Sequence, residues 1–240
     1  MPATLPYPCL CLVTDRTVCP PDELPQRVAA AVAGGVDLVQ LRDKEAPGGV
    51  LLEQAWDLRE IIQGRALLLV NERADVALAA GADGVQLGEM ALPVDEARTI
   101  LGPGAVIGRS VHSVPGALHA AVNGADFLLV GTMFATRSHP GEEPSGPGLL
   151  SRIASAGVAI PMLGIGGITA ENVAEVMASG ASGAAVITGI LASEDPETAA
   201  RRLKSAMLDT AAGNPSIEYE SQPAAAHRLA AQVTGDVAPP

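Results

Sequence analysis

The sequence predicts an α/β protein folded as a single-domain (β/α)8 TIM barrel, and two observations carry this prediction. The first is a sequence motif that occurs four times, starting at Gly35, Gly81, Gly124 and Gly180. Each copy has a glycine, then a small or polar segment, and then an apolar run. These starts are 46, 43 and 56 residues apart, and each spacing has room for two βα units. The second is that the apolar runs lack polar alternation, as expected of parallel strands covered on both faces. A doubly wound open sheet is the rival fold, but fourfold internal similarity favours closure.

The elements alternate regularly along the chain. The glycine of each repeat can end a helix in the left-handed conformation, and the apolar run after it supplies a strand. In chain order we expect strand 10–13, helix 22–33, the first repeat strand, helix 48–62, strand 66–70, helix 72–80, the second repeat strand, helix 93–101, strand 105–108, helix 114–122, the third repeat strand, helix 148–156, strand 160–164, helix 170–179, the fourth repeat strand and helix 196–208. The barrel is therefore assigned to 1–208. Residues 209–240 form a C-terminal tail that is either flexible or packed on a neighbouring subunit.

The composition excludes several classes of partner. Lys and Arg total 15 against 27 Asp and Glu, and the net charge of −12 is the opposite of that of a nucleic-acid or anionic-membrane binder. An aromatic content of 2% leaves no base-stacking platform. No apolar stretch of about 18 residues and no secretory signal is found. Cys9, Cys11 and Cys19 form neither a zinc pattern nor a disulfide framework, so we expect a cytoplasmic protein with free thiols.

Candidate site residues are sought after each strand, because barrel enzymes place their chemistry at the carboxyl ends of the strands. Gln40, Arg42 and Lys44 follow the second strand, and strand alternation directs them into the barrel mouth. Two cations this close need anionic partners when buried, which a phosphorylated or carboxylated ligand would supply. The alternative is a pair of solvated loop charges facing Asp43 and Glu45.

Polar groups also follow the third and fourth strands. Asn71 can contact a heterocycle or cap the next helix. Glu72 and Glu89 are the carboxylates at these strand ends, and together they would hold at most a water-rich Mg²⁺ shared with a phosphate. We expect no resident metal.

The fifth strand runs into Arg109, Ser110 and His112. An imidazole can both take and give a proton near neutral pH, which makes His112 the candidate catalytic residue. The alternative is a core or capping histidine. After the sixth strand a long loop, 132–148, is either a lid or a surface insertion, and its Thr136 and His139 are candidate substrate contacts.

Main-chain donors are predicted to bind a phosphate after the last two strands. Gly166 and Gly167 follow the seventh strand, and Ile187 and Thr188 follow the eighth. Paired glycines let main-chain N–H groups approach an anion closely, and these two loops are the usual phosphate site of such barrels. Such a site binds an anion without requiring a basic protein.

These segments together resemble one family. Gln40-Leu41-Arg42-Asp43-Lys44, Asn71, the Gly-X-Ser-X-His pattern at 108–112 and Gly164-Ile165-Gly166-Gly167-Ile168 are similar to the thiamine phosphate synthase superfamily, in the right order over roughly residues 9–207. The resemblance implies a (β/α)8 barrel and one of two activities. One is a synthase that joins a pyrimidine pyrophosphate to a thiazole phosphate using Mg²⁺. The other is a TenI-like thiazole tautomerase, which aromatises a carboxythiazole phosphate tautomer without a metal or redox cofactor.

Departures from the synthase pattern favour the tautomerase branch. Glu72 stands where the synthases have Asp, Ala91 matches the position of a second Mg²⁺-binding Asp, and His139 replaces a Lys. A pyrophosphate leaving group needs that positive charge and metal. Gln40 and Lys44 look more like the synthases, so the features are mixed.

The resemblance therefore implies an isomerase of thiamine biosynthesis, a thiazole tautomerase that acts through His112 without a cofactor. Its substrate carboxylate would be held by some of Arg42, Lys44 and Arg109, and its phosphate by the main chain after the last two strands. The alternatives are a Mg²⁺-dependent thiamine phosphate synthase, or a catalytically silent barrel that binds the phosphate ligand for regulation. We expect the protein to form a homo-oligomer. We expect its binding partner to be the small-molecule thiazole phosphate substrate.

Overall fold

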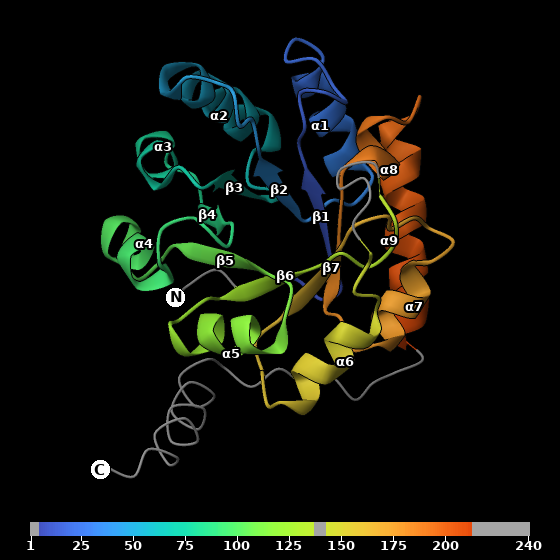
Figure 1. The fold of residues 1–240 in the computed structure, drawn as a ribbon. Helices are drawn as coiled ribbons and strands as arrows, with labels where there is room; N and C mark the ends of the chain where they lie inside the picture. The colour runs from blue at the N-terminus through green and yellow to red at the C-terminus, as the bar shows by residue number, and fades with distance from the viewer. Residues whose placement is uncertain (1–4, 137–142, 213–240) are drawn as a thin grey trace, which may run out of the picture.

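Eight short apolar segments pair in sequence order, each parallel to the next, and the eighth returns to the first (Figure 1). The computed structural model describes residues 5–136 and 143–212. Closure is made by β1 and β8, where Cys11 lies opposite Ala185. The predicted closed barrel is thus confirmed, and the open sheet is excluded. The strands are β1 (Cys9–Val13), β2 (Leu38–Leu41), β3 (Leu67–Asn71), β4 (Gly84–Leu87), β5 (Val106–Val111), β6 (Phe127–Gly131), β7 (Met162–Ile165) and β8 (Gly183–Val186).

Helices surround the strands as an outer layer. They are α1 (Leu24–Ala33), α2 (Gly48–Ile62), α3 (Ala74–Ala80), α4 (Val94–Leu101), α5 (Val114–Val122), α6 (Gly148–Ser155), α7 (Val173–Ala178), α8 (Thr188–Leu191) and α9 (Pro196–Ala212). Apart from shifts of one to three residues at other element ends, three details differ from the sequence-based prediction. β5 extends to Val111 instead of ending at Gly108, the short α8 was not expected, and α9 continues to Ala212, past the predicted start of the tail. The rest of the predicted tail lies outside the described residues.

The buried side chains form two cores. One fills the inside of the barrel and includes Leu38, Leu69, Phe127 and Leu163. The larger one lies between the strands and the helices and is built from Ala, Val, Leu and Ile. Successive strand residues point to opposite sides, so one uninterrupted apolar run supplies both cores.

The recurring motif has a structural role at the amino ends of the strands. Its polar residue, Asp37, Asp83, Asp126 or Ser182, directly precedes an even-numbered strand. The side chain accepts a main-chain N–H of the preceding odd-numbered strand, from Leu10 at 2.7 Å, Leu68 at 2.8 Å, Ile107 at 2.6 Å and Met162 at 3.1 Å respectively. Its own N–H donates back to the carbonyl of the same residue. Each repeat therefore fixes the register of one strand pair.

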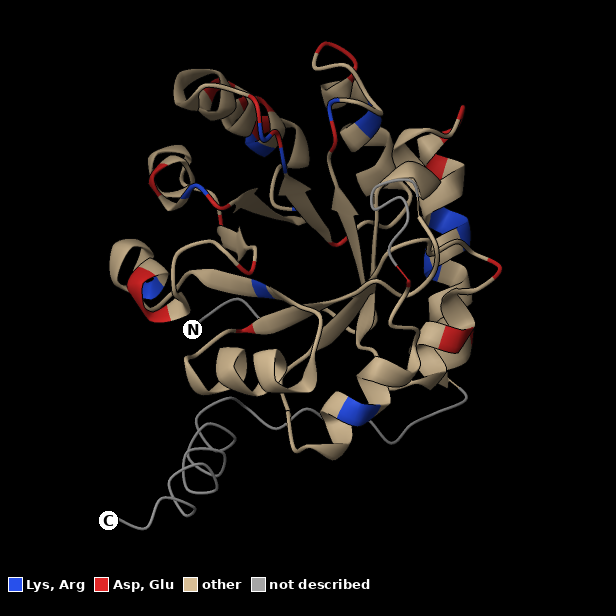
Figure 2. Ribbon diagram, in the orientation of Figure 1, with Lys and Arg blue, Asp and Glu red and all other residues tan. Residues whose placement is uncertain are grey.

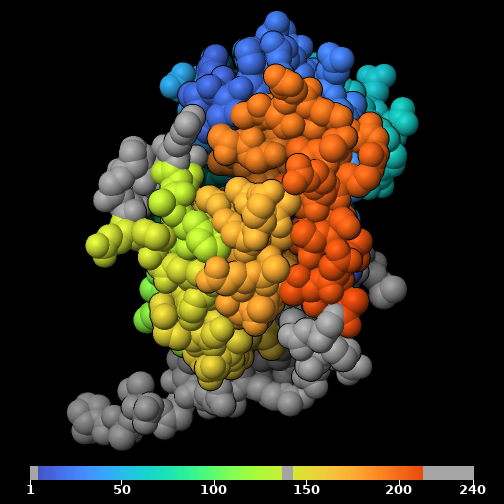
Figure 3. All heavy atoms as spheres, turned by 90° about the vertical axis from the view of Figure 1, so that its right-hand side faces the viewer, coloured from blue at the N-terminus to red at the C-terminus, as the bar shows by residue number. Residues whose placement is uncertain are grey.

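The first and last units of the barrel are tied together by charged side chains. Figure 3 shows the blue N-terminal segment against the orange C-terminal helices. Lys204 on α9 lies 2.6 Å from Asp37 and donates to the carbonyl of Pro8. Arg27 on α1 donates to the carbonyls of Leu191 and Ser193. These contacts close the helical layer at the same seam where β8 meets β1.

Charged residues lie mainly on the helices and in the loops, whereas the strands are almost free of them (Figure 2). Within the described strands Arg109 is the one exception. None of the helices in residues 5–136 and 143–212 combines the length and the apolar character needed to span a bilayer.

Candidate active site

The parallel strands bring their carboxyl ends to one rim of the barrel, and the predicted site residues in the described ranges lie at or just below that rim. They are Gln40, Arg42 and Lys44 at the end of β2, Asn71 at the end of β3, Arg109, Ser110 and His112 at the end of β5, Thr136 beyond β6, Gly166 and Gly167 after β7, and Ile187 and Thr188 after β8. His139 and the centre of the predicted lid, 137–142, lie outside the described residues.

Two buried glutamines lie beneath this rim. Gln40 is 4% exposed and donates from Nε2 to Asn71 Oδ1 at 2.8 Å. Gln86 on β4 is 1% exposed and donates from Nε2 to Ser110 Oγ at 3.1 Å. The Oε1 atoms of both glutamines are buried and accept no hydrogen bond from the described residues. Buried carbonyl oxygens normally find a donor, so these two suit a ligand that carries N–H groups. Gln86 was missed from the sequence, where it is simply a polar residue inside an apolar strand.

Arg42 is fixed at the rim by the neighbouring loop. Its main chain forms two hydrogen bonds with the Thr14 hydroxyl, one donated by the Arg42 N–H at 2.8 Å and one accepted by the Arg42 carbonyl at 3.1 Å. Its guanidinium lies 3.1 Å from Asp15 Oδ2. β2 ends at Leu41, so the alternation that predicted the direction of Arg42 and Lys44 stops before both residues. Lys44 is exposed.

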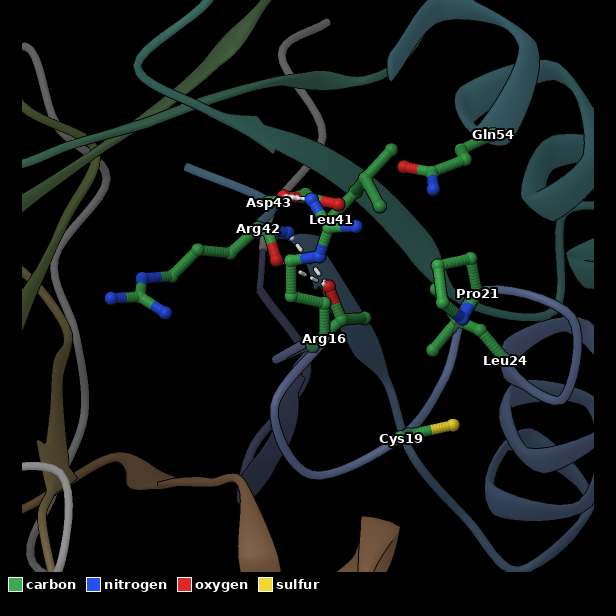
Figure 4. Close-up of a pocket in the computed structure, with 9 residues that line it drawn as sticks. Arg16, Cys19, Pro21, Leu24, Leu41, Arg42, Asp43 and Gln54 are labelled. Atoms are coloured by element: carbon green, nitrogen blue, oxygen red, sulfur yellow. Dashed lines mark hydrogen bonds and ion pairs between the residues drawn. The ribbon is translucent and has the colours of Figure 1, made fainter. Parts of the chain in front are cut away.

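A second ion pair joins the loop after β1 to the loop after β2. Arg16 lies 3.5 Å from Asp43, next to a cavity of about 10 Å³ (Figure 4). Cys19 and Gln54 also line this cavity, and Arg42 extends away from them. The space holds roughly one water molecule, so it is too small for an organic ligand.

Arg109 is engaged with the main chain of the loop between β4 and α4. It donates to the carbonyl of Leu92 at 2.8 Å and to that of Glu89 at 2.9 Å. The guanidinium therefore holds this loop in place. Its predicted contact with a substrate carboxylate stays a prediction without support from this geometry.

Glu72 places a carboxylate at the rim. Its backbone has φ of +60°, unusual for a residue with a side chain, and its N–H donates to the carbonyl of Gln86. A Cβ on Gly88 would lie 2.6 Å from Glu72 Oε1, so the carboxylate rests against the end of β4. Glu89 is exposed. The described residues contain no group of three or more His, Cys, Asp or Glu side chains that could bind a metal ion.

His112 follows the last residue of β5 and is exposed at the rim. Its Nδ1 lies 2.9 Å from the carbonyl oxygen of Gly131, at the end of β6. A carbonyl oxygen only accepts, so Nδ1 carries a hydrogen and Nε2 is the acceptor of the neutral ring. This contact fixes the direction of the ring between β5 and β6.

The glycine pair after β7 adopts conformations that other residues rarely take. Gly166 has φ of +104° and Gly167 has φ of +65°. A Cβ at Gly167 would lie 2.6 Å from the carbonyl oxygen of Ala135, so the loops after β6 and β7 pack closely. Asn172, which sequence reasoning missed, donates to the Gly167 carbonyl at 3.0 Å and accepts the Thr169 N–H at 2.8 Å. Asn172 therefore holds the glycine loop in shape.

The eighth strand leads directly into α8, which begins at Thr188. Ile187 is half-buried and Thr188 is exposed at the rim. The loops after β7 and β8 are adjacent because the two strands pair, with Ile165 opposite Ala185.

Comparisons with known proteins agree with this barrel. A family model described as thiamine monophosphate synthase matches residues 10–190. A thiamine-phosphate synthase of Methanoculleus marisnigri is 48% identical over 200 residues, which are 81% of this chain and 93% of the relative. Another from Chlorobium luteolum is 45% identical over 208 residues, 86% of this chain and 96% of the relative. A solved thiamine phosphate pyrophosphorylase from Pyrococcus furiosus has a TM-score of 0.77 at 36% identity, covering 84% of this chain and 96% of that one.

Proposed function

The chain belongs to the thiamine monophosphate synthase family, and from this membership we propose that it is a thiamine-phosphate synthase, a transferase of thiamine biosynthesis. The observation that carries the proposal is the 48% identity to a relative of that name across 93% of the relative's length. Further relatives at 42–45% identity carry the same name.

This corrects the expectation of an isomerase. The prediction of a thiazole tautomerase is wrong, because the relatives are named as synthases. Glu72 still supplies a carboxylate at the rim. Ala91 lies in a turn, where its N–H donates to the carbonyl of Gly88. Single differences at a few positions are a weaker guide to activity than similarity along the whole barrel.

The proposed reaction transfers a pyrimidinylmethyl group. The carbon–oxygen bond between the pyrimidine methylene and the diphosphate breaks, and its electron pair leaves on the diphosphate. The ring nitrogen of the thiazole phosphate forms the new carbon–nitrogen bond. The products are thiamine phosphate and inorganic diphosphate. Because negative charge gathers on the leaving group, positive charge at the rim lowers the barrier.

The residues after β2 are suited to the diphosphate. Arg42 presents a guanidinium whose fork geometry matches phosphate oxygens, and Lys44 adds a mobile point charge nearby. Ser110 and Asn71 supply shorter polar groups. The buried Oε1 atoms of Gln40 and Gln86, which accept no hydrogen bond from the described residues, suit a donor such as the amino group of the pyrimidine.

The thiazole phosphate would bind across the barrel mouth. The loops after β7 and β8 provide main-chain donors at Gly166, Gly167, Ile187 and Thr188, where a phosphate can approach without meeting a Cβ at the glycines. Two anionic groups then lie on separate sides of the mouth, with the reacting carbon and nitrogen between them.

The residues present fit a Mg²⁺ ion that is coordinated mainly by the phosphates of the substrate. Mg²⁺ keeps several waters and is commonly bound by one or two carboxylates together with substrate phosphates. Glu72 supplies such a carboxylate beside Gly88. Bound there, Mg²⁺ would neutralise charge on the departing diphosphate.

The test is direct. Purified protein is incubated with the pyrimidine pyrophosphate, the thiazole phosphate and MgCl₂, and thiamine phosphate is measured after conversion to its fluorescent thiochrome. We expect enzyme-like turnover with equimolar diphosphate release and loss of turnover in EDTA. Binding of both substrates without any product would overturn the proposal and leave a silent binding protein.

A further inference from the structure

We infer that Asp15, in the loop after β1, is a positioning residue that holds the Arg42 guanidinium at the rim so that its remaining N–H groups face a diphosphate. The inference deepens the proposed function and rests on it for the identity of the substrate. Asp15 belongs to no predicted site, and its two carboxylate oxygens contact Thr17 and Arg42.

The two carboxylate oxygens of Asp15 have separate partners. Oδ1 accepts the main-chain N–H of Thr17 at 2.9 Å and the Thr17 hydroxyl at 2.6 Å. Oδ2 faces the Arg42 Nη1 at 3.1 Å. The carboxylate is therefore anchored to its own loop by one oxygen and directs Arg42 with the other.

Arg42 is constrained from both ends. The Thr14 hydroxyl fixes its main chain, and Asp15 fixes one nitrogen at the tip of its side chain. Its Nε and Nη2 atoms donate no hydrogen bond to the described residues. A guanidinium carries five N–H donors in a rigid fork, so engaging one nitrogen sets the direction of the others at a small entropic cost.

The charge of Asp15 persists at neutral pH. Burial opposes its ionisation, but hydrogen bonds from Thr17 and the positive charge of Arg42 outweigh burial and hold the pKa of Asp15 below its ordinary value. The side chains of Arg42 and Asp15 are 27% and 17% exposed, so the pair is partly shielded from water. Such a pair limits the motion of Arg42 more than a fully solvated one would.

A positioning role and a purely electrostatic role of Asp15 predict opposite changes in the binding of an anion. If only net charge mattered, removing Asp15 would remove repulsion and tighten the binding of an anion. If Asp15 positions Arg42, its removal releases the guanidinium and weakens binding. The direction of the change therefore identifies the role of Asp15.

The experiment measures the binding of inorganic diphosphate by calorimetry, together with kcat and KM. For Asp15→Ala we expect about tenfold weaker binding and an equal rise in KM for the pyrimidine pyrophosphate, with kcat and the KM for thiazole phosphate changed less than about threefold. Asp15→Asn keeps the shape of the side chain and should show a smaller loss, and Asp15→Glu should recover part of the affinity. Glu45→Gln is the matched control, because it removes one nearby negative charge from an exposed residue that does not contact Arg42.

The outcomes separate this inference from the proposed function. Unchanged or tighter diphosphate binding in folded Asp15→Ala and Asp15→Asn overturns the inference even when the unaltered protein makes thiamine phosphate. Weakened binding without turnover by the unaltered protein supports the positioning of Arg42 and overturns the synthase proposal. Failure of the unaltered protein to bind diphosphate overturns the inference.

Discussion

The side-chain amide of Gln86 donates to the hydroxyl of Ser110 across 3.1 Å, joining β4 to β5 just beneath the rim. Because Ser110 Oγ accepts this bond, its own hydrogen remains available to donate to another acceptor. The glutamine has room only because residue 108 is glycine, since a Cβ there would lie 2.0 Å from Gln86 Oε1. Gln86, Gly108 and Ser110 therefore form one arrangement at the floor of the site.

Replacing Gln86 with leucine should separate function from stability. Loss of the donor to Ser110 is expected to lower kcat/KM for the pyrimidine pyrophosphate about tenfold. Thermal stability should be unchanged or higher, because an unpaired buried oxygen is removed as well. Gln54→Leu is the control, since Gln54 also has an unpaired buried oxygen but lies on α2. A similar loss of activity in both variants would argue against the role of Gln86.

Gly167→Ala and Gly180→Ala should differ in substrate binding. Both glycines have positive φ, at +65° and +98°, so each alanine variant should lose about 1–3 kcal/mol of unfolding free energy. Only at Gly167 would the new Cβ meet backbone, the carbonyl oxygen of Ala135 at 2.6 Å, whereas nothing lies within 4 Å at Gly180. We expect a higher KM for thiazole phosphate in Gly167→Ala alone. Calorimetry and steady-state kinetics test this, and equal KM values would remove the glycine loop from the phosphate site.

Glu72→Gln should raise the Mg²⁺ concentration that gives half-maximal activity by about tenfold, because one negatively charged ligand becomes neutral while the shape is kept. Titration of activity with MgCl₂ measures the shift. Glu89→Gln serves as the comparison, since Glu72 and Glu89 are both exposed carboxylates after neighbouring strands, and Glu89 contributes only its carbonyl to the described contacts. A larger shift in Glu89→Gln than in Glu72→Gln would transfer the metal role to Glu89.

The three cysteines should be unreactive in the folded protein. Burial raises the pKa of the Cys9, Cys11 and Cys19 thiols, so each carries less thiolate at pH 8 than a free cysteine does. We expect negligible reaction with a disulfide reagent in native buffer and reaction of all three thiols in denaturant. Both reactions are followed by the absorbance of the thiolate that the reagent releases. Rapid native modification of even one cysteine would contradict this burial.

The fold could be predicted from the sequence because its signal is repeated. The glycine-containing motif occurs four times, and in each copy the polar side chain accepts a main-chain N–H of the neighbouring strand. Strand ends were less predictable. β5 extends to Val111 because Arg109 and Ser110, which look like loop residues, pair with β6 opposite Leu128 and Leu129.

The site was predicted in part. Residues directly after strands, such as Arg42 and His112, could be placed at the rim because the fold alone puts them there. Contacts between loops could not be predicted, because the meeting of Asp15 with Arg42 depends on the register of β1 and β2. Gln86 gave no signal beyond its residue type. The prediction of a tautomerase is wrong, because three single departures, at Glu72, Ala91 and His139, are a weaker signal than similarity along the whole barrel.

The four polar residues that join odd strands to even strands all lie at the amino ends of the barrel, far from the chemistry. These contacts align each odd-numbered strand with the next even-numbered strand at the end of the barrel opposite the candidate site. A substitution at the candidate site therefore leaves these four contacts in place. The rim can therefore carry residues such as Glu72 and Ala91, which depart from the synthase pattern, while the barrel keeps its architecture.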